Sequence, residues 1–430
     1  MNNHGKTFHL YFFALLCLSL PLHAAYAEPE QWSRASRALK TADSEAAKEL
    51  SAQDRVILQA TLALKSDKPD QALKLLNAAN SQDPLVALLE AEAHRREAMQ
   101  AVEQAGDYAK KLQQQGQLLA SADLSRGLGE ADARLHSFMD KLDAVNGNPF
   151  DILLPGSNMA NVFMIDKALN RLYVFEPDHK GGLKKVADEY VVTGSVAGDK
   201  KKQGDARTPN GVYRFTQKLE GKKLEARYGP VAFPIDYPNE LDALHGKNGY
   251  GIWMHGYPFD VQRRPPQDTR GCFALSNERL VKMAQYVKLG RSWVIIGENL
   301  TFNQNHSQQA LLKSVRSDIE AWRSDWTSLD VDAYLSHYHR SFRSGKRDLA
   351  AWKRHKHRVN TGKTYVDVSF RDMTMVHDPN LWPEGEVVVA EFDQHYRSSN
   401  YSDIGRKRLY LARESADSPW KILLEEGLAQ

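Results

Sequence analysis

The chain has 430 residues, of which 42% are hydrophobic and 26% are charged, with 57 lysines and arginines against 54 aspartates and glutamates. This length is sufficient for two or three domains that each bury their own core. The near balance of charge gives no basis for nucleic-acid binding and only a weak attraction to anionic polymers.

The first residues have the three parts of a secretory signal peptide. Lys6 provides the positive start, Leu10 to Leu20 is an almost unbroken apolar stretch, and Ala25-Tyr26-Ala27 is a small-x-small cleavage site. The apolar stretch is too short to span a bilayer, although an uncleaved anchor is the alternative. We therefore expect residues 1–27 to be removed and the mature protein to act in the periplasm. No later stretch is apolar enough to predict a membrane span.

Residues 28–148 are predicted to form an α-helical domain, because Ala, Leu, Gln, Glu and Lys dominate and apolar residues recur at helical spacing. Pro69 and Pro84 each stand where a helix would begin. The stretch from Pro69 to Ala93 weakly resembles one tetratricopeptide-like hairpin, but no second copy follows. Packing, self-association or contact with a protein partner is the expected role. A turn cluster from Val145 to Pro149 ends the region.

The pattern then changes to short β-rich runs separated by glycine-rich turns. This pattern predicts an all-β sandwich or a small barrel. The expected strands are Asn161–Asp166, Arg171–Phe175, Tyr190–Thr193, Gly211–Phe215 and Ser292–Ile296, with a helix over Asn277–Leu289.

The mature chain would keep one cysteine, Cys272, because Cys17 lies in the leader. A lone thiol in an exported protein is a buried bystander, an intermolecular bridge or a nucleophile. His255 precedes it by seventeen positions and could accept the thiol proton. Gly271 would let a substrate carbonyl approach the backbone, where N–H groups could hold an oxyanion. Spacing alone leaves catalysis and packing equally open.

The residues around this cysteine resemble a known family. His255-Gly256, followed by Thr269-Arg270-Gly271-Cys272 and then Asn277, is similar to the signature of the YkuD-type L,D-transpeptidase catalytic domain. The segment from Thr208 to Tyr213 also resembles that family. The resemblance covers about Asn161 to Gly297, and we expect the domain to extend over residues 155–300. It implies a β-sandwich whose cysteine attacks the L,D bond after meso-diaminopimelate in peptidoglycan tetrapeptide stems. D-Alanine then leaves, and an amine or water resolves the acyl-enzyme.

The resemblance also implies a role for each motif residue. Cys272 would be the nucleophile and His255 the general base and later the acid. The Gly271 backbone carbonyl would orient the imidazole, and N–H groups around Gly271 and Cys272 would form the oxyanion hole. Substrate binding is expected from the remaining motif positions: Gly256, Thr269, Arg270 and Asn277.

Several charges near the motif have two readings. Arg270 stands where most family members have a second histidine, and arginine cannot act as a base. It is either a contact for a substrate carboxylate or a solvated loop charge. Lys200-Lys201-Lys202 and Arg263-Arg264 are expected to be solvated loop charges, although the lysines could hold acidic stem peptides near the site.

Residues 306–430 are predicted to form an α+β domain, because helices are followed by several strands. The helices are expected over Gln308–Ser328 and Asp332–Tyr338. This order resembles an NTF2-like cone domain and implies a binding or self-associating accessory. The aromatic residues are read as core more than as pocket: Trp322, Trp326, Tyr334 and Phe342. The expected strands lie near Tyr365–Ser369, Glu386–Tyr396, Lys407–Arg413 and Trp420–Leu424.

The whole chain is therefore predicted to be a multidomain protein with an N-terminal helical region, a central mainly-β YkuD-type sandwich and a C-terminal α+β NTF2-like cone. The last two modules together resemble the cell-shape L,D-carboxypeptidases of helical bacteria. On the basis of the catalytic motif, we expect L,D-transpeptidation first, with hydrolysis of the acyl-enzyme by water as the alternative. A function without catalysis, as a wall-binding scaffold, is the third hypothesis. No cofactor is expected. No metal is expected either, because the following histidines have no convincing carboxylate partner in the sequence: His337, His339, His355 and His357.

Overall fold

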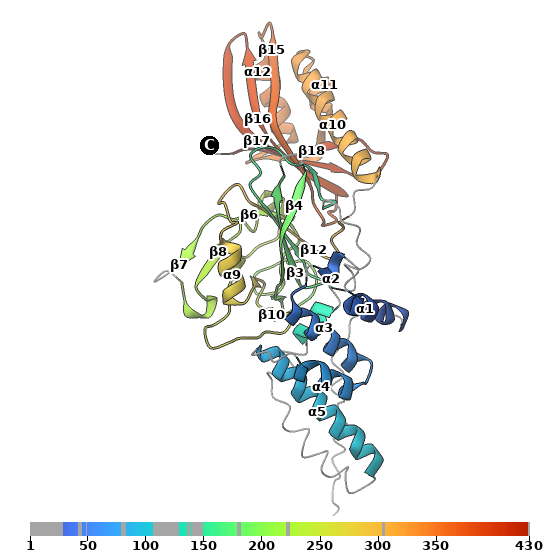
Figure 1. Cartoon of the computed structure of the whole chain (residues 1–430). Helices are drawn as coiled ribbons and strands as arrows, with labels where there is room; N and C mark the ends of the chain where they lie inside the picture. The colour runs from blue at the N-terminus through green and yellow to red at the C-terminus, as the bar shows by residue number, and fades with distance from the viewer. Residues whose placement is uncertain are drawn as a thin grey trace, which may run out of the picture.

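The computed structural model describes residues 29–41, 45–48, 50–78, 83–105, 129–135, 138, 149–178, 182–220, 224–302 and 306–428. The helices of the N-terminal region lie at one end, the central β-rich region follows, and the C-terminal α+β unit forms the other end (Figure 1). This arrangement confirms the predicted fold class. The predicted signal peptide, residues 1–27, lies outside the described residues. In the described part of the chain, no helix is both long and apolar enough to cross a membrane.

The N-terminal helices begin where the local sequence predicts. Ser51 caps α3 by accepting a hydrogen bond from the Asp54 N–H, and Pro69 and Pro84 are the first residues of α4 and α5. Apolar residues of α3, α4 and α5 share one core. The helices described before residue 106 are α1 (Pro29–Thr41), α2 (Glu45–Lys48), α3 (Ala52–Lys65), α4 (Pro69–Ala78) and α5 (Pro84–Ala105).

The central region contains a sheet with the strand order β4-β3-β2-β12-β6. The bounds are β2 (Val162–Asp166), β3 (Arg171–Pro177), β4 (Leu183–Tyr190), β6 (Gly211–Arg214) and β12 (Trp293–Gly297). A second sheet has the order β11-β9-β8-β7, with β7 (Leu219–Glu220), β8 (Val231–Pro234), β9 (Trp253–His255) and β11 (Phe273–Ala274). A short parallel pair joins β5 (Thr193–Gly194) to β10 (Gln267–Thr269). The region also holds η3 (Ala226–Tyr228), α8 (Glu240–Leu244) and α9 (Asn277–Ala284), which ends earlier than the predicted Leu289.

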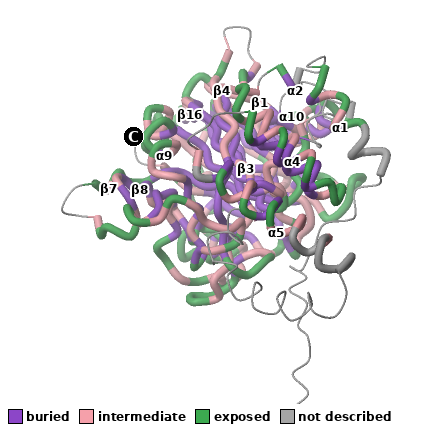
Figure 2. The backbone as a smooth tube through the Cα atoms, turned by 60° about the horizontal axis from the view of Figure 1, so that its bottom comes forward, coloured by how far each residue is buried: buried purple, intermediate pink, exposed green. Residues whose placement is uncertain are grey.

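The first of these sheets is buried on both faces. Along β2, Phe163 and Ile165 enter the core shared with the second sheet, whereas Val162 and Met164 enter a core shared with the C-terminal unit. This is why β2 is apolar without alternation, as strands covered on both faces are. Figure 2 shows the resulting buried strands, with β3 among them, through the middle of the molecule.

The C-terminal unit is a sheet with the order β1-β15-β16-β17-β18-β13-β14 and helices packed on it. Its helices are α10 (His306–Thr327), α11 (Val331–Ser336) and α12 (Leu349–Asn360). Its strands are β1 (Ile152–Leu154), β13 (Tyr338–Ser344), β14 (Arg347–Asp348), β15 (Val366–His377), β16 (Glu386–Ser398), β17 (Tyr401–Arg413) and β18 (Lys421–Leu428). The sequence analysis did not predict α12, β13 or the pairing of β1, a strand from before the catalytic region, with β15.

Candidate active site

The second sheet brings the two halves of the cysteine motif together. His255 is the last residue of β9, and Cys272 directly precedes β11. These strands pair in parallel, with Phe273 opposite Met254 and Ala274 opposite His255. The segment between them therefore leaves β9 and returns the chain to the neighbouring strand. This supports the predicted flap connection between the histidine and the cysteine.

Tyr228 is a neighbour of the His255 side chain. Its ring lies 5.1 Å from the His255 ring, edge to face. Burial raises the pKa of Tyr228, although the Arg227 guanidinium opposes this shift. Tyr228 was not predicted as a site residue, because η3 has no motif that the sequence analysis could use.

The imidazole of His255 is buried and held in one tautomer. Its Nδ1 lies 2.6 Å from the Gly256 carbonyl oxygen. A carbonyl can only accept, so Nδ1 carries the hydrogen and Nε2 is the basic nitrogen. The prediction that the Gly271 carbonyl orients the ring is wrong in this respect, because the carbonyl of the very next residue already occupies that position.

Burial shifts the pKa values of the two reactive groups in opposite directions. It lowers the pKa of His255 to about 4, and the nearby cations Arg264 and Arg227 lower it further. It raises the pKa of Cys272 to about 11, although the Trp253 backbone N–H favours the thiolate. The thiol also lies 3.3 Å from the Gly251 carbonyl oxygen, which can accept its hydrogen. At neutral pH the site therefore holds a neutral thiol and a neutral imidazole.

The turn before the cysteine is fixed by two threonine hydroxyls. Thr269 Oγ1 donates to the Cys272 carbonyl over 2.6 Å and accepts from the Gly271 N–H over 3.1 Å. Thr208 Oγ1 lies 3.3 Å from the same carbonyl and accepts from the Gly194 N–H over 2.9 Å. Thr269, predicted to bind substrate, thus contacts the protein's own backbone, and Thr208 shares that task.

Gly271 is required by its surroundings. Its φ is +120°, and a Cβ at this position would lie 2.7 Å from the Arg207 carbonyl oxygen. Arg270 beside it is exposed.

Gly256 and Asn277 shape the chain just after His255. The Asn277 Oδ1 accepts from the Tyr257 N–H over 2.9 Å, and a Cβ on Gly256 would lie 2.2 Å from that oxygen. The glycine is thus needed for the close approach of the asparagine. Both residues, predicted to bind substrate, act here on the loop that follows the histidine.

The lysine run is not uniformly solvated. Lys200 is buried and pairs with Asp205 over 2.6 Å, whereas Lys201 and Lys202 are exposed. Burial alone would raise the pKa of Asp205, but Lys200 and neighbouring backbone N–H groups hold it well below its ordinary value. Lys200 therefore fixes the loop before Thr208, and only the other two lysines fit the prediction of solvated charges.

A second polar feature lies in the C-terminal unit, where a cavity of about 540 Å³ is lined by aromatic and basic residues, Trp326, Trp352, Tyr396, Lys363 and Lys407 among them. The Lys356 Nζ lies 4.8 Å over the Trp326 ring, and burial lowers the pKa of this lysine to about 8. Trp322, Tyr334 and Phe342 are core residues, as predicted, whereas Trp326 belongs to both core and cavity.

Among the described residues, no group of three or more His, Cys, Asp or Glu side chains is arranged to hold a metal ion. Two of the histidines considered from the sequence do have carboxylate neighbours. His337 lies 2.7 Å from Asp325, and His357 lies 3.4 Å from Asp332.

Comparison with known proteins places these features in a family. The family model of the YkuD L,D-transpeptidase catalytic domain matches residues 160–296, and that of the Cds6 C-terminal NTF2-like domain matches residues 314–426. The crystal structure of the helical cell shape determining protein Pgp2 from Campylobacter jejuni is 31% identical, with a TM-score of 0.55. The match covers 65% of this chain and 96% of that one. The chain belongs to the YkuD L,D-transpeptidase family.

Another solved structure is similar over nearly the same share of both chains. Bd1075 from Bdellovibrio bacteriovorus is 26% identical with a TM-score of 0.57, over 66% of this chain and 99% of that one. No curated protein matches the chain. Both His255 and Cys272 lie inside the YkuD match, whereas helices α1 to α5 lie outside both family matches.

Membership of the YkuD family makes this chain an enzyme of the L,D-transpeptidase type and supports a peptidoglycan L,D-transpeptidase or L,D-carboxypeptidase role. Stem peptides fit that role as substrates. The C-terminal unit is an NTF2-like domain.

Proposed function

We propose that this YkuD-family protein cleaves the L,D bond after meso-diaminopimelate in peptidoglycan tetrapeptide stems, with Cys272 as the nucleophile and D-alanine as the leaving group. The observation that carries the proposal is the pairing of β9 with β11, which sets a neutral imidazole with a free Nε2 on the strand next to a partly exposed thiol. The predicted leader and the family's peptidoglycan substrates support action in the periplasm.

In the first half-reaction, the His255 Nε2 takes the thiol proton as Cys272 Sγ attacks the diaminopimelate carbonyl carbon. Because the Gly271 N–H is already bonded to Thr269 Oγ1, the oxyanion donor we assign at this turn is the Cys272 N–H. The C–N bond then breaks, and the imidazolium gives its proton to the departing D-alanine amine. The product is a thioester on Cys272.

In the second half-reaction we favour water as the acceptor. The neutral imidazole takes a proton from water as the oxygen adds to the thioester carbonyl, and the thiol is released with a tripeptide stem. The support is the similarity of both modules together to Pgp2, a protein described as determining helical cell shape, and to the cell-shape L,D-carboxypeptidases. By the same likeness, we propose a role in cell shape.

Transpeptidation is the second candidate, and the catalytic motif with its YkuD match favours it. Here an amine attacks the same thioester and forms a 3-3 crosslink. The proposed domain limits are 28–148 for the helical domain, 155–300 for the catalytic domain and 306–430 for the NTF2-like domain, with β1 added to the C-terminal sheet.

Mass analysis of muropeptides distinguishes these outcomes. The mature protein is incubated with disaccharide tetrapeptide, alone and as a mixture with a second stem that carries a free amine. Tripeptide as the only product supports hydrolysis, whereas 3-3 dimers support transpeptidation. Unchanged tetrapeptide in both reactions contradicts the enzyme proposal and supports the wall-binding scaffold.

A further inference from the structure

The helical region packs directly on the segment that joins His255 to Cys272. Within the helical stretch 129–135, a Cβ at Gly129 would lie 3.2 Å from the Pro266 ring. Ala133 packs against a cluster that contains Tyr257 and Ala274. Tyr257 lies two residues after His255, and Ala274 of β11 pairs with His255 of β9. The helical region therefore packs on a cluster whose members Tyr257 and Ala274 lie two residues after His255 and Cys272, respectively.

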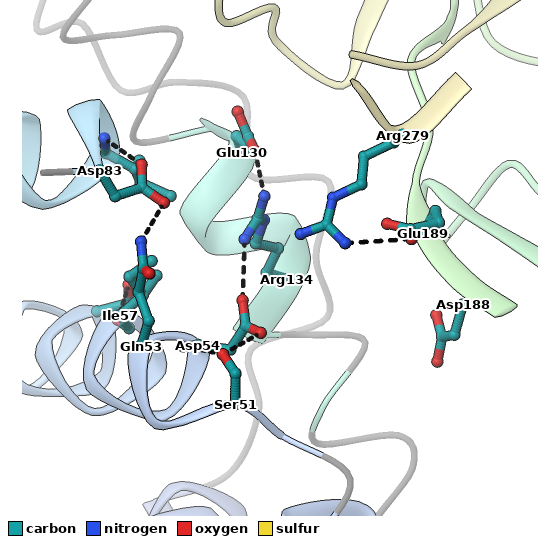
Figure 3. A network of polar contacts seen from close by, with 12 residues as sticks. Ser51, Gln53, Asp54, Ile57, Asp83, Glu130, Arg134, Asp188, Glu189 and Arg279 are labelled. Carbon is teal, nitrogen blue, oxygen red and sulfur yellow. Dashed lines mark hydrogen bonds and ion pairs between the residues drawn. The ribbon is translucent and has the colours of Figure 1, made fainter. Parts of the chain in front are cut away.

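An arginine of the same segment ties it to two helices. Arg263 contacts Asp83, just before α5, and its Nη1 lies 3.0 Å from Glu130 Oε1. Glu130 also accepts from Arg134 over 2.7 Å, and Arg134 reaches Asp54 of α3 over 3.4 Å (Figure 3). The expectation that Arg263 is a solvated loop charge is wrong, because its side chain is only 17% exposed and that of Glu130 only 4%.

Because these ion pairs are buried, their loss should disturb the structure around them. Exposed ion pairs contribute little, but removing one partner of a buried pair leaves an uncompensated charge. Residues 257–266 form no strand or helix, and the Thr193 N–H donates to the Pro266 carbonyl over 3.0 Å at their end. Packing and side-chain contacts therefore contribute much to the position of the residues before Pro266. Arg264 makes its ion pair within the segment, with Asp268 over 2.9 Å. Arg263 instead connects the segment to the helical region.

We propose that the helical region is a positioning element for the catalytic pair, and that Arg263 is the positioning residue through which it acts. The contact of Arg263 with Asp83 and Glu130 fixes the segment that leaves β9 at His255 and enters β11 after Cys272. This gives residues 28–148 a role that neither family match assigns. The two turnover readouts below, kcat and the acid limb of kcat/KM, rest on the proposed function, whereas the alkylation readout does not.

The test compares full-length Arg263→Gln with the wild type by three readouts. We expect kcat for D-alanine release to fall about tenfold with KM changed less than about twofold, because the pair is displaced while the substrate contacts remain. Alkylation of Cys272 by iodoacetamide, followed by intact-protein mass, should become several times faster as the thiol becomes more accessible.

The third readout is the acid limb of kcat/KM. A loosened segment admits water to His255, so the limb should move from about pH 4 towards about pH 6.5. The charged groups that act on the pKa of this ring are Arg264 from the segment and Arg227 from η3, and the Tyr228 ring lies 5.1 Å from it. Arg263→Gln removes none of these groups, so a shift of the acid limb would indicate that water has reached the His255 ring.

Matched variants separate positioning from general destabilisation. Arg279 pairs with Glu189 over 3.3 Å, outside the segment, and Arg279→Gln should leave all three readouts unchanged (Figure 3). Arg263→Lys keeps the charge and should restore part of the turnover. Adding Asp83→Asn to Arg263→Gln should lower kcat little further, because both changes break the same ion pair.

Unchanged kcat, alkylation rate and acid limb in Arg263→Gln, with only a lower melting temperature, would overturn the proposal. If Arg263→Gln does not fold, Asp83→Asn carries the same test, because it breaks the Arg263–Asp83 ion pair. If the wild type releases no D-alanine while alkylation still differs between the variants, the proposed function fails and the positioning role stands.

Discussion

At the scale of single residues, the environment of His255 and Cys272 determines how the chemistry can start. Burial disfavours the charged form of each group, which lowers the pKa of the imidazole and raises that of the thiol. An ion pair between them is therefore not the resting state. The imidazole is instead available as a general base when a substrate carbonyl arrives.

The pH profile of turnover should reflect these shifts. His255 must be neutral to act, and its folded pKa of about 4 keeps it neutral down to mildly acidic pH. We expect kcat/KM to be flat from about pH 5 to pH 9 and to fall about tenfold per pH unit below the histidine pKa. An acid limb centred near pH 6.5 in the wild type would contradict this assignment.

Gly271→Ala should be damaging for a local steric reason. The new methyl group would meet the Arg207 carbonyl at 2.7 Å, and the backbone is in a region that alanine adopts poorly. We expect a loss of about 2–4 kcal/mol in stability, measured by denaturant unfolding, together with loss of turnover. Gly204→Ala is the control, since its φ is +79° and nothing lies within 4 Å of the added Cβ. A similar loss in both variants would mean that backbone strain, and not the contact, is responsible.

The sequence was sufficient to predict the two reactive residues but not all of their supports. Cys272 and His255 stood out because the residues around them resemble the YkuD signature, whereas a lone thiol and an upstream histidine by themselves left a packing role equally open. The Gly256 carbonyl and Tyr228 carry no comparable signal, because backbone geometry and a ring contact depend on how β9 and η3 fold. Thr269 and Asn277 were predicted to bind substrate, and the partners that the structure gives them are backbone groups of the protein itself.

At the scale of elements, the short strands β9 and β11 position His255 and Cys272. The Thr208 hydroxyl connects the backbone at Cys272 to β5. Thr208 is fully buried, and its Oγ1 connects the Gly194 N–H to the Cys272 carbonyl. Thr208→Val removes that hydroxyl while keeping the shape, so two backbone groups lose a partner. We expect about 1–3 kcal/mol lower stability and a reduced kcat.

Thr208→Ser is the matched control for this prediction, because it keeps the hydroxyl and loses only a methyl group. Its turnover should stay closer to that of the wild type than that of Thr208→Val. Equal kcat in both variants would show that the methyl group, not the hydrogen bonds, supports the turn.

Elements with a strong local signal could be predicted, and those that depend on distant partners could not. The prolines that begin α4 and α5 act within the first turn of each helix, so they can be recognised locally. The apolar run of β2 is typical of a buried strand. Strand β1 is only three residues long and is defined by its pairing with β15, far away in the sequence. Helix α12 is rich in charged residues, and its buried residues are Trp352 and Lys356, so few apolar residues mark it in the sequence.

At the scale of the whole molecule, the catalytic and NTF2-like units share a continuous core. Apolar residues of β2 and β12 pack with residues of β16 and β17 in one cluster. A buried ion pair crosses the same boundary, with Arg214 Nη2 lying 2.8 Å from Glu391 Oε1. The units are therefore expected to unfold together.

Glu391→Gln tests this coupling. Burial alone would raise the pKa of Glu391, but Arg214 and Arg408 outweigh it and lower the pKa. The carboxylate therefore contributes stability above its unfolded pKa, and that contribution is lost as the pH falls through the folded value. We expect a loss of about 3 kcal/mol at pH 7 by denaturant unfolding, with the difference from the wild type narrowing in acid.

The control for this variant is a surface pair on the NTF2-like unit alone. Asp367 lies 3.2 Å from Arg397, and both side chains are largely exposed. Asp367→Asn should cost less than about 1 kcal/mol. A Glu391→Gln variant as stable as the wild type would argue that the two units are held by apolar packing only.

The most direct test of the account is D-alanine release from purified disaccharide tetrapeptide by the wild type and by Cys272→Ser, together with the intact mass of the quenched enzyme. We predict release by the wild type, an acyl adduct on Cys272 that lacks D-alanine, and neither with the serine variant. Release of D-alanine by Cys272→Ser at the wild-type rate, or none from either protein, would contradict a thioester formed by this cysteine.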